Sequence, residues 1–208
     1  MKYSIMVGVP TTGNPSSYYW QITLTRYMAE ASSIAESATN FVRDYSVATA
    51  RERIAKEAVR RGVDFVLFID DDVIPTVNPI TNFLSYAYPV MCGVYFEKNM
   101  KGLNLHVKRG EKYVRLKPDE LPNRLFSVDA CGLGLAMIHT SIFEALIKRN
   151  KQMFAYTVRK GEDIHFFEVL NKELGIKPLV IPNIKAYHVI KAPFVITPEG
   201  KNEMMAFI

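Results

Sequence analysis

The chain has 208 residues, of which 49% are hydrophobic and 23% are charged, as is usual for one sizeable globular domain. The formal charge of +5 favours an acidic ligand or surface, but acidic and basic residues are mixed along the chain, so we expect no nucleic-acid partner. No apolar run is long enough for a transmembrane segment and the amino terminus lacks the layout of a signal peptide, so we expect a cytoplasmic protein.

The first half of the chain alternates between strand and helix patterns. We predict strands over 3–9, 41–42 and 64–70, and helices over 18–33, 46–61 and 78–86. Ser16 or Ser17 would cap the first helix, and Gly62 would end the second. This alternation predicts a doubly wound parallel sheet, in which the loops after the first three strands line one crevice.

The third predicted strand carries the clearest chemical signal, because its apolar run ends in Asp70, Asp71 and Asp72. Such a run predicts a strand buried on both faces, and alternation along it would point Asp70 and Asp72 to the same side. Two carboxylates about 7 Å apart repel by about 2 kcal/mol, which a bound Mg²⁺ or Mn²⁺ would offset. The alternative is a solvated acidic turn that opens a helix, with Asp71 or Asp72 as its cap. Three aspartates in succession after a buried strand favour the metal site.

Strand patterns dominate the next part of the chain. We predict strands or hairpin arms over 90–96, 103–108, 112–116, 125–130 and 133–139, helices over 142–149 and 163–174, and final strands over 179–182 and 185–190. Cys92 and Cys131 have no metal or redox spacing and are expected to be buried core residues. The sequence contains no internal repeat and no low-complexity linker, so residues 1–208 are predicted to form a single domain.

The order of several motifs resembles the family-two-like GT-A glycosyltransferases with a D-x-D motif. Besides the aspartate triplet, the likeness rests on Ala50-Arg51 with Ile54, on Val128-Asp129-Ala130-Cys131-Gly132-Leu133-Gly134, on Gly161-Glu162-Asp163 and on Tyr187-His188. It implies an α/β fold of GT-A type, with a Rossmann-like, mostly parallel sheet flanked by helices and a mixed or antiparallel acceptor-side half. The domain would then consist of a nucleotide-sugar-binding half (1–98), an acceptor and catalytic half (99–190) and a C-terminal tail (191–208).

The activity implied by the resemblance is a metal-dependent, inverting transfer of a sugar. The donor would be a UDP- or GDP-sugar, and the acceptor a hydroxyl group of a glycan, protein or lipid. By this resemblance Asp72 is the chief ligand of Mn²⁺ or Mg²⁺, Asp70 supports the ion or the ribose, and Asp71 assists through water. His188 would be the third metal ligand, although a lone histidine on a strand equally fits a packed core residue.

The resemblance also assigns a catalytic base and the nucleotide contacts. Asp163 would deprotonate the acceptor hydroxyl, and Glu162 would bind the acceptor or tune that carboxylate, although acids at this place also suit the start of a helix. The nucleotide contacts fall at the ends of the first two strands and on the second helix, namely at Pro10, Thr11, Asp44 and Arg51. An arginine on a helix equally fits a surface charge.

Two other functions stay open from the sequence. A D-x-D after an apolar strand also begins phosphatases of the haloacid dehalogenase type, with Asp70 as the nucleophile. In those enzymes the strand lies near the amino terminus, whereas here two strand–helix units precede it. A non-catalytic relative would bind a nucleotide or glycan without transfer, but a pure binder has no need of a base such as Asp163.

Overall fold

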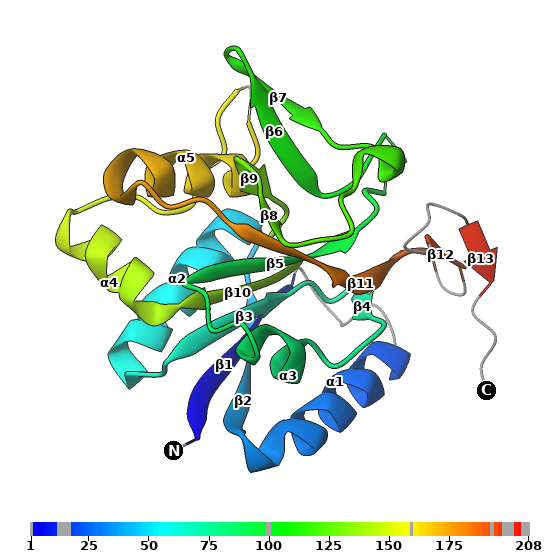
Figure 1. Cartoon of the computed structure of the whole chain (residues 1–208). Helices are drawn as coiled ribbons and strands as arrows, with labels where there is room; N and C mark the ends of the chain where they lie inside the picture. The colour runs from blue at the N-terminus through cyan, green and yellow to red at the C-terminus, as the bar shows by residue number, and fades with distance from the viewer. Residues whose placement is uncertain are drawn as a thin grey trace.

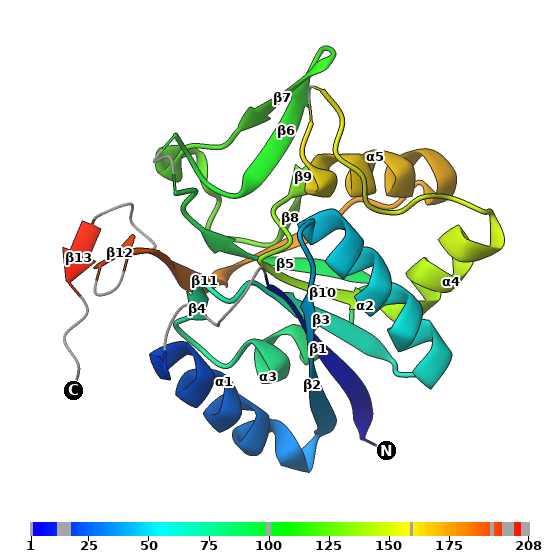
Figure 2. The same cartoon turned by 180° about the vertical axis from the view of Figure 1, so that it is seen from behind.

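One large sheet with helices on both of its faces forms the body of the protein, seen here in a computed structural model (Figure 1; Figure 2 shows the opposite side). The structure describes residues 2–11, 18–98, 101–158, 160–191, 194–196 and 202–204. The predicted caps Ser16 and Ser17 lie outside these residues, as does most of the predicted tail.

The elements follow one another closely along the chain. The strands are β1 (Tyr3–Thr11), β2 (Ala35–Arg43), β3 (Phe65–Ile69), β4 (Val73–Pro75), β5 (Val90–Tyr95), β6 (Leu105–Arg109), β7 (Lys112–Arg115), β8 (Phe126–Ser127), β9 (Ala130–Cys131), β10 (Leu135–His139), β11 (Leu179–Lys191), β12 (Phe194–Ile196) and β13 (Asn202–Met204). The helices are α1 (Tyr18–Glu30), α2 (Val47–Arg61), α3 (Pro79–Leu84), α4 (Thr140–Lys148) and α5 (Glu162–Leu174), with short 3-10 helices at Ala31–Ser33 and Pro118–Glu120.

The main sheet has the strand order β13-β12-β11-β5-β10-β3-β1-β2. Along this path β10 and β12 run against the other strands, which share one direction. A second, antiparallel sheet of β7, β6 and β9 stands beyond the main sheet at the top of Figure 1. The predicted combination of a mostly parallel sheet with a mixed or antiparallel second half is therefore confirmed.

The helices cover the two faces of the main sheet unequally. Helices α2, α4 and α5 contribute to one apolar core cluster, and α1 and α3 contribute to the cluster on the opposite face. Strand β3 lies between both clusters, and all five of its residues are buried, as its apolar run predicted. Among the described residues, no helix is both long and apolar enough to span a membrane.

Two differences between the predicted and the observed strands have clear physical reasons. Strand β2 covers nine residues, whereas the sequence predicted only 41–42, because β2 lies at the edge of the sheet and several of its side chains are exposed and polar. The two predicted final strands are one strand, β11, whose pairing with β5 shifts register between Val180 and Lys185.

The pairing of the strands brings their carboxyl ends together at one edge. Thr11 at the end of β1 pairs with Arg43 at the end of β2, and β3 runs parallel to β1 on its other side. Strand β4 pairs with β11 so that Val73 lies opposite His188. Residues far apart in the sequence therefore meet where the aspartate triplet leaves β3.

Candidate functional site

The aspartate triplet forms a turn rather than a continuation of the strand. Strand β3 ends at residue 69, and the N–H of Val73 donates a hydrogen bond of 3.0 Å to the carbonyl oxygen of Asp70. The expectation that strand alternation orients Asp70 and Asp72 is therefore wrong. The triplet also does not cap a helix, because Asn78 is the N-cap of the next helix, α3.

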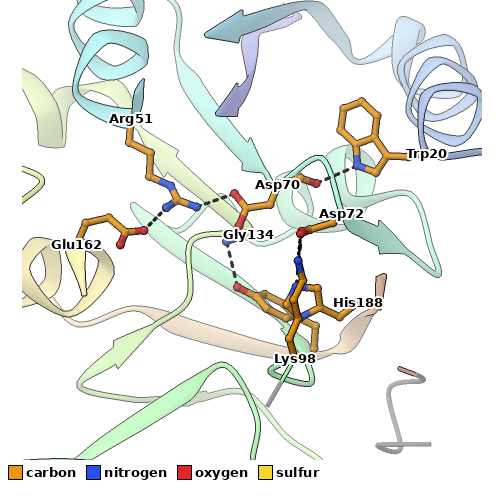
Figure 3. Close-up of polar contacts among 9 residues, drawn as sticks. Trp20, Arg51, Asp70, Asp72, Lys98, Gly134, Glu162 and His188 are labelled. Atoms are coloured by element: carbon orange, nitrogen blue, oxygen red, sulfur yellow. Dashed lines mark hydrogen bonds and ion pairs between the residues drawn. The ribbon is translucent and has the colours of Figure 1, made fainter. Parts of the chain in front are cut away.

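Each of the three carboxylates has a different partner. Asp70 accepts a hydrogen bond of 2.6 Å from Arg51, and Asp71 accepts one of 2.6 Å from the hydroxyl of Thr11. Asp72 faces His188 and forms an ion pair with the ammonium group of Lys98 (Figure 3). The turn therefore distributes the three negative charges toward three separate parts of the fold.

His188 is held in a fixed orientation toward Asp72. Its side chain is buried, its ring meets the ring of Tyr95 edge-on at 5.4 Å, and its Nδ1 lies 2.7 Å from the carbonyl oxygen of Phe96. Because a carbonyl oxygen can only accept, Nδ1 carries the shared proton and Nε2 is left facing Asp72 Oδ1 at 3.5 Å. Burial opposes ionisation of Asp72, but the hydrogen bonds and charges of His188 and Lys98 hold its pKa below the ordinary value. His188 is thus both packed in the core and directed at the triplet.

Arg51 is a buried bridge between two acidic segments (Figure 3). Its side chain is 2% exposed, and its guanidinium group contacts Asp70 after β3 and Glu162 at the start of α5. Burial opposes the charge, but the two carboxylates raise the pKa of Arg51 above its ordinary value, so the group stays protonated. The nucleotide contact expected for Arg51 stays a prediction. The observed contacts show that Arg51 also positions the carboxylates of Asp70 and Glu162.

The backbone of Asp70 is fixed by Trp20, which the sequence did not single out, and by Gly134, the last residue of the glycine-bearing motif. The indole N–H of Trp20 donates to the carbonyl oxygen of Asp70 at 2.9 Å, and the N–H of Asp70 donates to the carbonyl oxygen of Gly134 at 3.1 Å. The N–H of Gly134 donates to the hydroxyl of Tyr95 at 3.2 Å. A Cβ at Gly134 would lie 2.8 Å from both Asp70 Oδ2 and that hydroxyl, so only glycine fits this wall of the site. A lone tryptophan and one tyrosine among eleven give no spacing signal in the sequence.

Asp163 lies in the first turn of α5, next to the Glu162 that Arg51 holds. Its Oδ1 accepts a hydrogen bond of 2.7 Å from the N–H of Ile164, so the carboxylate also satisfies a free donor of the helix start. Burial and the neighbouring Glu162 raise the pKa of Asp163 to about 6. A carboxylate with this pKa is suited to accept a proton near neutral pH.

Three of the predicted nucleotide contacts, Pro10, Thr11 and Asp44, lie at the ends of β1 and β2. The N–H of Asp44 donates to the carbonyl oxygen of Thr11 at 3.1 Å, and the carboxylate of Asp44 pairs with Arg53 at 3.2 Å. A hollow of about 350 Å³ is lined by Arg43, Asp44, Tyr45 and Arg53. Tyr45 is fully exposed there and offers a flat aromatic surface, although the sequence did not mark it. Pro10 is one residue from the end of β1, opposite Val42.

The structure brings together only two of the three predicted metal ligands. Within the described residues, no group of three or more histidine, cysteine and acidic side chains is arranged around one point. Asp72 and His188 are adjacent, whereas the carboxylate of Asp70 is turned toward Arg51. An oxygen and an imidazole nitrogen are a donor pair that Mn²⁺ accepts readily, and Mg²⁺ prefers the oxygen.

Solved structures with the same fold include three of interest. A197 from STIV matches with a TM-score of 0.68 at 21% identity, over 99% of this chain and 95% of that one. S. aureus TarS matches with a TM-score of 0.50 at 14% identity, over 93% of this chain and 37% of TarS. A glycosyltransferase involved in the glycosylation of the major capsid of PBCV-1 matches with a TM-score of 0.50 at 13% identity, over 88% of this chain and 83% of that one.

No protein-family model and no curated protein matches the chain. At the identities of the solved structures, the likeness concerns the fold and not the chemistry. The predicted α/β fold of GT-A type, with helices on both sides of a large sheet and a small antiparallel sheet beside it, is confirmed.

Proposed function

We propose that the protein is a metal-dependent glycosyltransferase that moves a sugar from a UDP- or GDP-sugar to a hydroxyl acceptor with inversion. One observation carries this proposal: the Asp72–His188 pair is joined, through the triplet and Arg51, to the acidic start of α5 (Figure 3). A group suited to a metal and a group suited to a proton transfer are therefore linked by one chain of neighbouring residues. The fold likeness to the glycosyltransferase of PBCV-1 supports the same conclusion.

The fit to a metal ion rests on the orientation of His188. Because Nδ1 donates to the carbonyl oxygen of Phe96, Nε2 faces Asp72 Oδ1 at 3.5 Å, and both atoms could serve as ligands of one cation. Ligands bound at about 2.1 Å to one ion lie about 3 Å apart when they are at right angles, so a small cation fits between them after a slight adjustment. Metal-binding histidines commonly donate their other N–H to a backbone carbonyl in this way.

In the proposed reaction, Asp72 and His188 would hold Mn²⁺ or Mg²⁺, with Asp70 and Asp71 in support. When bound, the ion would stabilise the negative charge on the departing nucleoside diphosphate. Asp163 would accept the proton of the acceptor hydroxyl as the hydroxyl oxygen forms the new bond to the anomeric carbon. Displacement on the side opposite the leaving group inverts that carbon.

The first test concerns the metal and the donor together. We expect one UDP- or GDP-sugar to raise the melting temperature when Mn²⁺ is present, because a ligand at a hundred times its Kd adds about 2.7 kcal/mol to the free energy of unfolding. Excess chelator should remove most of this shift, and Asp72→Asn should weaken it in the same way. An unchanged donor affinity in chelator would contradict the proposed metal site.

A product assay separates the alternative functions. A glycosyltransferase should release nucleoside diphosphate from the nucleotide sugar when the acceptor is added. A phosphatase of the haloacid dehalogenase type would instead release inorganic phosphate from a phosphomonoester. A binding protein without catalysis would release neither.

The second test concerns His188. His188→Ala should weaken donor binding in Mn²⁺ by about tenfold or more, because the ion would lose one of its two protein ligands. Donor binding in chelator should stay as in the unmodified protein, and this comparison is the control. If His188 only packs in the core, the melting temperature would fall while the ratio of affinities with and without Mn²⁺ stayed the same.

A further inference from the structure

A basic hollow lies between the hairpin β6–β7 and the start of α5. Its volume is about 580 Å³, and its lining includes the candidate base, Asp163. Figures 1 and 2 place this hairpin beyond the main sheet, beside the segment that leads into α5. The other ionisable groups that line the hollow, apart from the phenol of Tyr113, are Lys101, His106, Arg115, Lys117 and Lys160.

Positive charge exceeds negative charge around this hollow. Its lining contributes four cationic side chains and a single carboxylate, that of Asp163. Two flanking acids form ion pairs with these cations. Glu97 Oε2 lies 3.9 Å from Arg115 Nη2, and Glu168 Oε1 lies 2.5 Å from Lys160 Nζ. The cations still outnumber the carboxylates when both acids are counted. The first turn of α5 adds backbone N–H groups, whose dipoles also favour an anion.

Two buried nitrogen atoms in the lining lack a hydrogen-bond partner among the described residues. They are Nδ1 of His106, whose side chain is 7% exposed, and Nε of Arg115. Burial and the nearby Arg115 lower the pKa of His106 to about 4, so the imidazole is neutral at neutral pH. A buried polar atom left without a partner costs about 1–3 kcal/mol. Side chains with spare hydrogen-bonding groups beside four cations suit a ligand that carries several oxygen atoms.

We propose that this hollow binds a phosphate group of the acceptor, so that the enzyme glycosylates a phosphorylated acceptor. The inference rests on the proposed function and specifies its acceptor. The forked N–H groups of arginine and the ammonium groups of lysine together match the oxygen atoms of a phosphate. Because Asp163 lines the same hollow, a phosphate held there would bring a neighbouring hydroxyl of the same molecule to the base.

The geometry separates this hollow from the proposed place of the donor. The donor diphosphate would meet the ion between Asp72 and His188, where Lys98 supplies a further positive charge. The contacts of Arg51 with Asp70 and Glu162 lie between that pair and the start of α5 (Figure 3). The two anionic groups would therefore bind on different sides of Arg51.

A calorimetric titration tests the phosphate site without donor or metal. We expect glycerol 1-phosphate to bind and glycerol to show no binding. Lys117→Gln and Arg115→Gln should each weaken this binding by about tenfold, because each removes a charge next to the phosphate. Lys112→Gln is the matched control, since Lys112 is an exposed lysine on the same hairpin outside the hollow. Equal binding of glycerol, or an equal loss in the Lys112 variant, would overturn the proposal.

A second titration is made in saturating nucleoside diphosphate and Mn²⁺. Unchanged binding of glycerol 1-phosphate would support an acceptor site, and competition would overturn it because the phosphate would then occupy the donor site. Vesicles with and without phosphatidic acid identify the source of the phosphate, since only a lipid acceptor would retain the protein on the phosphatidic acid vesicles. Failure of every nucleotide sugar to react would refute the proposed function, whereas absent phosphate binding would refute this inference alone.

Discussion

Asp163→Asn should lower the rate of sugar transfer by at least about a hundredfold, because a general base contributes about a hundred- to ten-thousand-fold. Asparagine keeps the shape and the oxygen that accepts the N–H of Ile164, but it cannot take a proton from the acceptor. Donor binding and the melting temperature should therefore stay nearly unchanged. Glu173→Gln is the control, because Glu173 pairs with Lys151 near the other end of α5.

The pH dependence gives an independent readout of Asp163. Its pKa is raised to about 6 by burial and by Glu162, and only the ionised carboxylate can act as a base. We therefore expect kcat/KM to fall about tenfold per pH unit below pH 6 and to level off above it. The Asn variant should lose this acidic limb. A product with retained configuration, or near-normal transfer by the variant, would mean that Asp163 only stabilises the start of α5.

Arg51→Met should lower the free energy of unfolding by about 3–5 kcal/mol, because Asp70 and Glu162 would lose their shared cation in a buried setting. Urea denaturation measures this change. The pKa of Asp70, which burial already raises, would rise further in the variant. A folded-state pKa above the unfolded value means that stability is retained at low pH and lost as the pH rises through that pKa. The loss of free energy of unfolding in Arg51→Met, relative to the unmodified protein, should therefore be smaller at about pH 4 than at about pH 8.

The chain offers a matched control on the same helix. Arg53 pairs with Asp44 in an exposed setting, so Arg53→Met should change the free energy of unfolding by less than about 1 kcal/mol. Arg51→Lys should recover part of the stability, since one ammonium group restores the charge but not the fork that reaches two carboxylates. Equal effects of the Arg51 and Arg53 substitutions would show that the buried bridge contributes no more to the free energy of unfolding than an exposed ion pair.

The sequence predicted those parts of the fold whose residues are buried on a regular pattern. Strand β3 was predicted from its continuous apolar run, and its residues are indeed buried. Helix α2 was predicted from apolar residues that repeat at helical spacing between Ser46 and Gly62. Edge strand β2 was largely missed because only Ala35 of its nine residues is buried, so its sequence shows no regular apolar pattern. The burial of Arg51 could have been predicted from its position in the sequence. Arg51 follows Val47 by four residues and precedes Ile54 by three, so it lies on the apolar stripe of α2.

The site depends on contacts that the order of residues does not reveal. The approach of His188 to Asp72 was expected only from the family resemblance, and its physical cause is the pairing of β4 with β11. In the sequence, the cations of the basic hollow are mixed with acidic residues and form no block of like charge. They come from the region around the hairpin and from Lys160, so only the folded chain gathers them beside α5.

The position of β10 has a consequence for the protein as it is being synthesised. Strand β10 covers the edge of β3, with Leu135 opposite Ile69, so that edge has no partner until the chain has grown past residue 139. A nascent chain of β1, β2 and β3 would meanwhile expose the unpaired edge of a fully apolar strand, which is the kind of surface that pairs with other chains. Slow translation between β3 and β10 should therefore increase aggregation, and a chaperone that covers the emerging edge should increase the yield of folded protein.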